Sequence, residues 1–172
     1  MPARFRNFLV IALGLAGLSG CSTTDDDKCP LASSLIDTAS YTQLAQNGQP
    51  VYTVQVQKVT ADCDISKSDH TVQSSLDIDF TATRAYGGSP QSFDAPYFVA
   101  VTQGGRVITK RQYTLHVGFD GGQTSATVEE SRDSPTIRMD KGKHPYDYAV
   151  LVGFQLTPAQ LDYNRTAGRY AK

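Results

Sequence analysis

The clearest pattern in the chain is a strict alternation of apolar and polar side chains over residues 72–84. Leu76, Ile78 and Phe80 take every second position there, with polar residues between them. Because successive side chains of a strand point to opposite faces, a period of two predicts a strand with one buried face and one wet face. Such strands are typical of antiparallel sheets.

Six further segments have the composition of strands. They are residues 51–62, 97–103, 107–119, 124–130, 135–139 and 146–156. Gly104-Gly105 predicts a hairpin, because a type I′ turn needs a positive φ at both central positions. Asp120-Gly121-Gly122 predicts another tight turn, so residues 97–130 would form a three-stranded meander. Residues 85–95 are rich in Gly, Ser and Pro, which predicts a loop.

Helical signals are confined to the two ends of this region. Residues 31–37 have apolar side chains at nearly helical spacing, which predicts a short helix followed by irregular chain. Thr157-Pro158-Ala159-Gln160 has the form of a capping box and predicts a C-terminal helix. The whole pattern predicts a mostly β fold: a single antiparallel β-sandwich of about seven strands, immunoglobulin-like or fibronectin-like, with a short N-terminal helix and a short C-terminal helix. A small closed barrel is the alternative.

The chain begins with the three parts of an export signal. Arg4 and Arg6 are followed by an uncharged apolar stretch over residues 8–18, and then by small residues before Cys21. The apolar stretch is too short for a membrane-spanning helix, which needs about 20 residues. We therefore expect an export signal at residues 1–20. It is either the signal peptide of a lipoprotein, which we favour for the reason given next, or an ordinary signal peptide that happens to precede a cysteine.

Leu18-Ser19-Gly20-Cys21 resembles the lipobox of bacterial lipoproteins. In that family the cysteine thiol is diacylglycerylated, the leader is cut just before it, and the new amine is acylated. The resemblance implies that Cys21 is the lipidation site and that residues 21–28 form a lipidated flexible tether. Ser22 resembles the outer-membrane pattern of enterobacterial lipoproteins. The expected location is therefore the outer membrane, lipid-anchored and facing the periplasm, with the inner membrane or the cell surface as alternatives.

The charge balance argues against nucleic acid as a partner. Removal of residues 1–20 takes away two of the 16 basic side chains, and the remaining 14 face 17 acidic ones, a formal charge of −3. Nucleic-acid-binding domains usually carry clustered basic residues instead. About 150 mature residues suit one domain, which we place at residues 29–165, with a basic tail at residues 166–172.

Two cysteines remain once Cys21 is acylated. Cys29 and Cys63 would lie in an oxidising compartment, which favours a disulfide. Closing a loop of about 35 residues would stabilise the fold by roughly 3–4 kcal/mol. Two free buried thiols or a metal-binding pair are the alternatives, although no Cys-x-x-Cys spacing supports a metal site.

Catalytic patterns are missing from the sequence. It contains no Gly-x-Ser-x-Gly, no His-Glu-x-x-His and no phosphate-binding glycine loop. His70, His116 and His144 are widely spaced and form no ligand pattern, and His116 is expected to point outward from its strand. We therefore predict a protein that is not an enzyme and that has no catalytic residues, metal site or cofactor.

Two longer segments carry a further resemblance. Residues 96–101 read Pro-Tyr-Phe-Val-Ala-Val, and residues 152–165 read Val-Gly-Phe-Gln-Leu-Thr-Pro-Ala-Gln-Leu-Asp-Tyr-Asn-Arg. Together with the lipobox and Cys29-Pro30, they resemble a group of uncharacterised proteobacterial lipoproteins. The resemblance covers most of the mature chain and implies a location and an architecture, but no activity.

Two functions remain open. The favoured one is a non-enzymatic module that binds a protein partner in the envelope or supports its structure, through strand edges and loops. Gln155, Asn164 and Arg165 are candidate interaction residues, although polar groups at a strand-to-helix junction can also simply brace the helix. The alternative is a glycan- or peptidoglycan-binding module with aromatic platforms. Its candidate platforms are Tyr86, Tyr97, Tyr146, Tyr148 and Tyr163.

Overall fold

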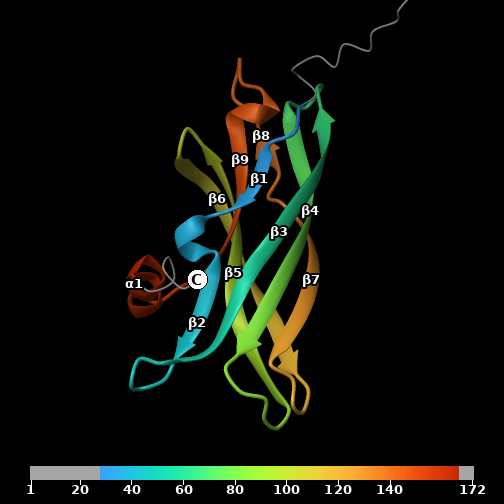
Figure 1. Cartoon of the computed structure of the whole chain (residues 1–172). Coiled ribbons are helices and arrows are strands. Elements are labelled where there is room, and N and C mark those ends of the chain that lie inside the picture. Colours follow the sequence, from blue (N-terminus) through green and yellow to red (C-terminus); the bar gives the residue numbers. More distant parts are fainter. Residues whose placement is uncertain (1–27, 167–172) are drawn as a thin grey trace, which may run out of the picture.

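The computed structural model describes residues 28–166, which are mostly β, with two sheets and one α-helix (Figure 1). The predicted signal peptide, the lipidated Cys21 and most of the tether lie outside the described residues, as does the tail beyond Thr166. Those predictions stay predictions. Within the described part, no helix has the length and apolar character needed to cross a membrane.

The first sheet has four strands in the order β1-β9-β5-β6. Their bounds are Leu31–Ser34 for β1, Tyr148–Phe154 for β9, Gln91–Gln103 for β5 and Arg106–Phe119 for β6. β5 pairs antiparallel with both of its neighbours, whereas β1 runs parallel to β9. The predicted central position of the last strand is confirmed, because β9 lies between β1 and β5.

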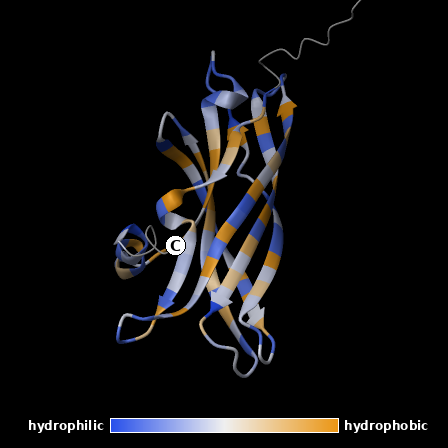
Figure 2. Cartoon of the chain, in the orientation of Figure 1, coloured by the Kyte–Doolittle hydropathy of each residue, from blue (hydrophilic) through white to orange (hydrophobic). Residues whose placement is uncertain are grey.

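The second sheet is antiparallel throughout and has the order β2-β3-β4-β7, with the short β8 also paired to β4. Its strands are Ser40–Leu44 (β2), Pro50–Ser66 (β3), Thr71–Arg84 (β4), Ser125–Asp133 (β7) and Ile137–Arg138 (β8). The bands of alternating hydropathy run along β3 and β4 in Figure 2.

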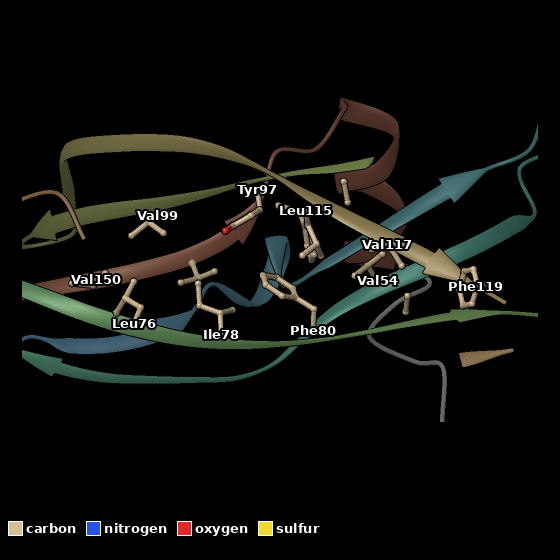
Figure 3. Close-up of a cluster of buried hydrophobic side chains, with 14 residues drawn as sticks. Val54, Leu76, Ile78, Phe80, Tyr97, Val99, Leu115, Val117, Phe119 and Val150 are labelled. Carbon is tan, nitrogen blue, oxygen red and sulfur yellow. The ribbon is translucent and has the colours of Figure 1, made fainter. Parts of the chain in front are cut away.

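Both sheets direct side chains into one core (Figure 3). The alternation predicted for β4 is confirmed, because Leu76, Ile78 and Phe80 are all buried. Phe80 meets Tyr97 of the other sheet edge-to-face, with 5.3 Å between the ring centroids. Such aromatic contacts stabilise the two sheets against each other beyond their buried area.

The predicted helix at residues 31–37 is wrong. The chain forms β1, then a single 3₁₀ turn, η2 (Ile36–Thr38), and then β2, in the region expected to be irregular. β1 pairs with β9 of the first sheet, and β2 pairs with β3 of the second. Extended chain prevails here because it can hydrogen-bond to a sheet edge, as in the 3.0 Å bond from the Leu35 N–H to the Val152 carbonyl.

The predicted meander is also wrong. Gly104 and Gly105 have positive φ and join β5 to β6 as expected. The next turn, however, carries the chain into the other sheet, where β7 pairs with β4. The structure has nine strands in its described part, with one parallel pair, and β5 begins at Gln91, inside the segment expected to be a loop.

The end of the domain follows the prediction closely. A 3₁₀ turn, η3 (Pro145–Asp147), takes up the start of the segment expected to be the last strand, so β9 begins at Tyr148. The predicted C-terminal helix is present as α1 (Pro158–Thr166). It lies beside η2 and β2 on the outside of the sheets (Figure 1).

Candidate interaction surface

The predicted capping box attaches α1 to the domain. Thr157 Oγ1 accepts a hydrogen bond from the Gln160 backbone N–H at 3.3 Å, and Gln160 Oε1 accepts one from the Thr157 backbone N–H at 2.9 Å. Gln160 Nε2 also donates to the Thr42 carbonyl at 2.9 Å. Gln160 is buried, so one side chain both caps the helix and ties it to β2.

Asn164, one of the predicted interaction residues, makes a second tie. Its Nδ2 donates to the Asp37 carbonyl at 3.0 Å and to the Ser40 carbonyl at 2.8 Å, and its side chain is 7% exposed. Arg165, the next residue, points its Nε at Asp37 Oδ2 at 3.0 Å. Asn164 therefore holds α1 against η2 from within the contact, whereas Arg165 remains half-exposed at its surface.

Gly153 lets η2 approach β9. A Cβ placed on Gly153 would overlap Thr38 Oγ1 and would lie 2.9 Å from Phe98 Cζ. Real Cβ atoms are not found so close to other heavy atoms. The glycine in the predicted last strand is therefore explained by the close packing of η2 on the outer face of the first sheet.

An open groove of about 760 Å³ lies where β1, η2, β9 and α1 meet. Its apolar lining comes from Leu35, Ile36, Leu151 and Leu161. Ile36 is 80% exposed, although most large apolar side chains of the described part lie inside the core. Figure 2 shows apolar colour where the chain enters η2, beside α1. The arrangement is a solvent-facing apolar surface with a charged pair, Asp37 and Arg165, at its lining.

Gln155, the third predicted interaction residue, lies outside the groove. Its Oε1 accepts hydrogen bonds from Lys110 Nζ at 2.7 Å and from Gln112 Nε2 at 3.4 Å. The Lys110 ammonium lies over the Phe98 ring, 4.1 Å from its centroid. Gln155 therefore contacts β6 and does not brace α1.

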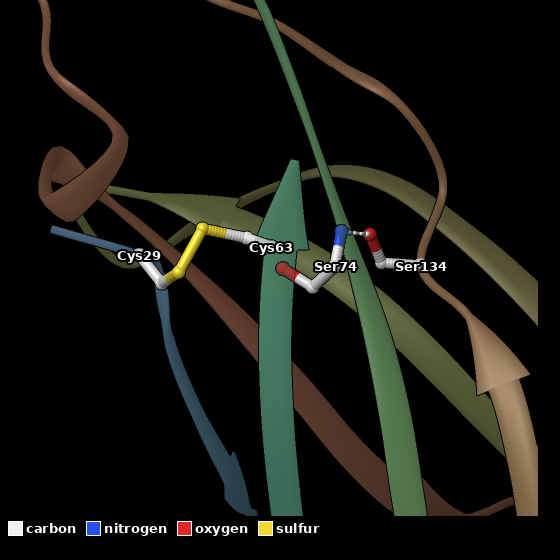
Figure 4. The surroundings of a disulfide bond; sticks show 4 residues. All are labelled: Cys29, Cys63, Ser74 and Ser134. Atoms are coloured by element: carbon white, nitrogen blue, oxygen red, sulfur yellow. Dashed lines mark hydrogen bonds between the residues drawn. A yellow bond between two sulfur atoms is a disulfide. The ribbon is translucent and has the colours of Figure 1, made fainter. Parts of the chain in front are cut away.

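The predicted disulfide is present between Cys29 and Cys63, with 5.7 Å between the two Cα atoms (Figure 4). It ties the residues just before β1 to β3. Ser74 and Ser134 lie nearby, and the Ser74 backbone N–H donates to Ser134 Oγ at 2.9 Å. The disulfide therefore fixes the point at which the chain enters the domain.

One core tyrosine, Tyr97, has a strongly raised pKa. Burial and the neighbouring Glu130 carboxylate raise the pKa of Tyr97 to about 12. The Tyr97 hydroxyl donates to Glu130 Oε2 at 3.4 Å, and Glu130 also pairs with Arg132. His116 points outward as predicted and contacts Asp94 at 2.6 Å. Residues 28–166 contain no group of three or more His, Cys, Asp or Glu side chains that could hold a metal ion.

The candidate tyrosines are not brought together. Tyr97 and Tyr148 are buried in the core, whereas Tyr86 is 85% exposed in the turn between β4 and β5. Tyr146 is exposed in η3, at the other end of the strands, where it stacks on the His144 ring with 5.0 Å between centroids. Tyr163 is half-buried on α1.

Comparison of the chain with models of protein families, with curated proteins and with solved structures found no match in any of the three.

Sequence reasoning missed the groove itself. It selected Asn164 and Arg165 by their polarity, and both contact η2, but it placed Leu35 and Ile36 in a short helix. The available signal was that a helix over residues 31–37 would have contained two adjacent serine side chains, Ser33 and Ser34, beside those apolar ones. That composition suits exposed extended chain better.

Proposed function

We propose that this chain is a lipid-anchored protein of the bacterial envelope, facing the periplasm, that binds a protein partner without catalysing a reaction. The lipobox-like segment that ends at Cys21 supports the lipid anchor. Ser22, which resembles the outer-membrane pattern of enterobacterial lipoproteins, supports a location in the outer membrane. The observation that carries the binding function is the exposed apolar groove around Ile36.

An apolar groove of this kind suits a protein ligand. Exposed apolar side chains that gather next to each other mark interaction sites more often than scattered ones do. Leu35 and Ile36 are both exposed and both line the groove, and Leu151 and Leu161 extend it onto β9 and α1. Asp37 and Arg165 add a charged pair beside the apolar side chains. A partner that places complementary charges against this pair would be favoured over one that does not.

We infer that the two sheets form a β-sandwich related to immunoglobulin and fibronectin domains. In those domains one sheet pairs strand A with B and B with E, and the other pairs C with F. The pairings β3 with β4, β4 with β7, and β5 with β9 follow the same order along the chain. β1, parallel to β9, stands where the last strand of such a domain would pair with its neighbour.

Glycan or peptidoglycan binding remains the alternative function. A sugar-binding platform needs exposed aromatic faces that lie near one another. The candidate tyrosines most exposed in this structure, Tyr86 and Tyr146, lie at opposite ends of the strands. The protein-binding proposal therefore has the stronger geometric support.

Site-specific photocrosslinking in intact envelopes tests the proposal. A photoreactive residue at Ile36 should capture a defined protein, because it would lie against the partner's surface. The matched control is the same residue at Val107, which is 56% exposed and apolar but lies on β6. Capture of the same protein equally well from Val107, or of peptidoglycan fragments alone from Ile36, would overturn the protein-binding proposal.

A further inference from the structure

A second surface lies at the end of the domain where the disulfide is. A cleft of about 730 Å³ lies there between three segments: the turn that follows β3, the strand β8, and the loop that precedes η3. Four exposed basic side chains line it: Lys67, Arg138, Lys141 and Lys143. Ile65 and Met139 give it an apolar part that packs on a small core near the disulfide.

The charge of this cleft is opposite to that of the mature chain. Two acidic side chains, Asp69 and Asp140, also line it. Each already accepts a hydrogen bond, from Ser66 Oγ at 2.7 Å and from Gln103 Nε2 at 3.3 Å. Four basic and two acidic groups give the cleft a formal charge of +2, against −3 for the chain without residues 1–20.

The other end of the strands lacks such a cluster. Its turns, residues 45–49, 85–90 and 120–124, contain a single charged side chain, Asp120. The basic side chains of the turns therefore gather at the disulfide end, whereas Arg84 at the other end is hydrogen-bonded to the carbonyls of Ser89, Asp120 and Gln123. The disulfide end is the end at which the chain enters the domain (Figure 1).

The length of the preceding chain sets which end is close to the anchor. Cys29 stands eight positions after Cys21, and even a fully extended chain of that length reaches at most about 28 Å. β3 alone has 17 residues and is roughly 55 Å long. A lipid on Cys21 would therefore keep the disulfide end nearest the bilayer, and the turn at residues 45–49 would stay far from it.

We propose that the basic cleft docks on anionic lipid headgroups of the leaflet that carries the anchor. This inference rests on the lipid anchor proposed above. Lys and Arg near an anionic leaflet are attracted to it over about a Debye length, and their N–H groups hydrogen-bond phosphate oxygens. Docking of this end would hold the domain upright, so that the apolar groove at η2 faces the periplasm and not the lipid.

Vesicle flotation tests this docking without the anchor. The protein is the whole mature chain, residues 21–172, with Cys21→Ser, so that neither leader nor acyl chain contributes. It should float with vesicles that mix phosphatidylglycerol into phosphatidylcholine and not with phosphatidylcholine alone. The double variant Lys141→Gln/Lys143→Gln should bind roughly 30-fold more weakly, because each lysine near an anionic surface contributes about five-fold.

The control variant removes two charges elsewhere. Lys58→Gln/Lys110→Gln lowers the net charge equally, on β3 and β6, and should leave binding unchanged. Equal loss in both double variants, equal binding to both kinds of vesicle, or complete displacement by free inorganic phosphate at constant ionic strength would overturn headgroup docking. None of these outcomes bears on acylation, which fractionation of Cys21→Ser cells tests separately: a protein that stayed in the membrane fraction would contradict the anchor.

Discussion

At the scale of single residues, Gly153 decides whether η2 can lie on the first sheet. Thr38 occupies the space where a side chain on Gly153 would lie, and Phe98 of the neighbouring strand borders the same space. Because both neighbours are held in place by their own elements, neither can move away cheaply. The position of the apolar groove therefore depends on a residue that is buried beneath it.

Gly153→Ala should lower the free energy of unfolding by about 2–3 kcal/mol, because the added methyl overpacks a filled site. Urea denaturation measures the change. The matched control is Gly118→Ala on β6, where an added Cβ meets no atom within 4 Å, and this variant should be neutral or more stable by about 0.5 kcal/mol. Equal destabilisation by both substitutions would show that the close approach to Thr38 is unimportant.

The fold strongly changes the titration of Tyr97. Its pKa rises from 10.0 to about 12 because burial and the Glu130 carboxylate both disfavour the phenolate. A pKa raised in the folded state means that the folded state holds the proton more tightly than the unfolded one. The resulting stabilisation is present below pH 10 and is lost as the pH rises from 10 towards 12.

The free energy of unfolding should therefore fall more steeply with pH above 10 in the wild type than in Tyr97→Phe. Chemical denaturation at a series of alkaline pH values measures both slopes. An ultraviolet titration of the folded protein should also lose a tyrosine step near pH 12 in the variant. Parallel slopes for the two proteins would contradict the assignment.

At the scale of elements, short segments near the chain ends hold the groove together. α1 is attached to β2 and η2 by two side chains. Gln160 donates a hydrogen bond to a backbone carbonyl of β2, and Asn164 donates to one carbonyl of η2 and one of β2. β1 is attached to β9 by backbone pairing and, just before its start, to β3 by the disulfide. The groove thus lies between two separately fastened elements.

Asn164→Ala should cost about 1–3 kcal/mol, because two carbonyls lose a buried donor. It should also raise hydrogen exchange in residues 158–166 ahead of global unfolding. Asp162→Ala on the exposed side of the same helix is the control and should change neither quantity. Unchanged exchange in Asn164→Ala would mean that α1 is held by something else.

The disulfide should stabilise the fold by about 3–4 kcal/mol, since it closes a loop between residues 34 apart. The double variant Cys29→Ser/Cys63→Ser measures this against the wild type in urea. In the denatured, unreduced wild type, a thiol reagent should label neither cysteine. Efficient labelling of both would remove the disulfide from the account.

The sequence predicted a strand well where the strand's own pattern of apolar and polar side chains shows which of its faces are buried. β4 alternates strictly because one of its faces is wet, and β9 is apolar on both faces because one face lines the core and η2 packs on the other. β1 and β2 were missed because their conformation comes from pairing with distant strands, which local spacing does not reveal. The destination of β7 was missed for the same reason: a tight turn at Gly122 permits either sheet.

At the scale of the whole molecule, the two ends and the two sides of the domain differ. The basic cleft lies at the end where the chain enters, and the apolar groove lies on the outer face of the first sheet. The sequence predicted the disulfide from two cysteines and a compartment. It could not predict either surface, because each is assembled from residues far apart in the chain.

The anchor proposed at Cys21 is the claim on which both surfaces depend for their orientation. Mass spectrometry of the N-terminal peptide of the protein isolated from its native membrane tests it most directly. The account predicts a peptide that begins at Cys21 and carries the mass of a diacylglycerol and a further acyl group. An unmodified thiol at Cys21, or a peptide that still contains residues 1–20, would contradict it.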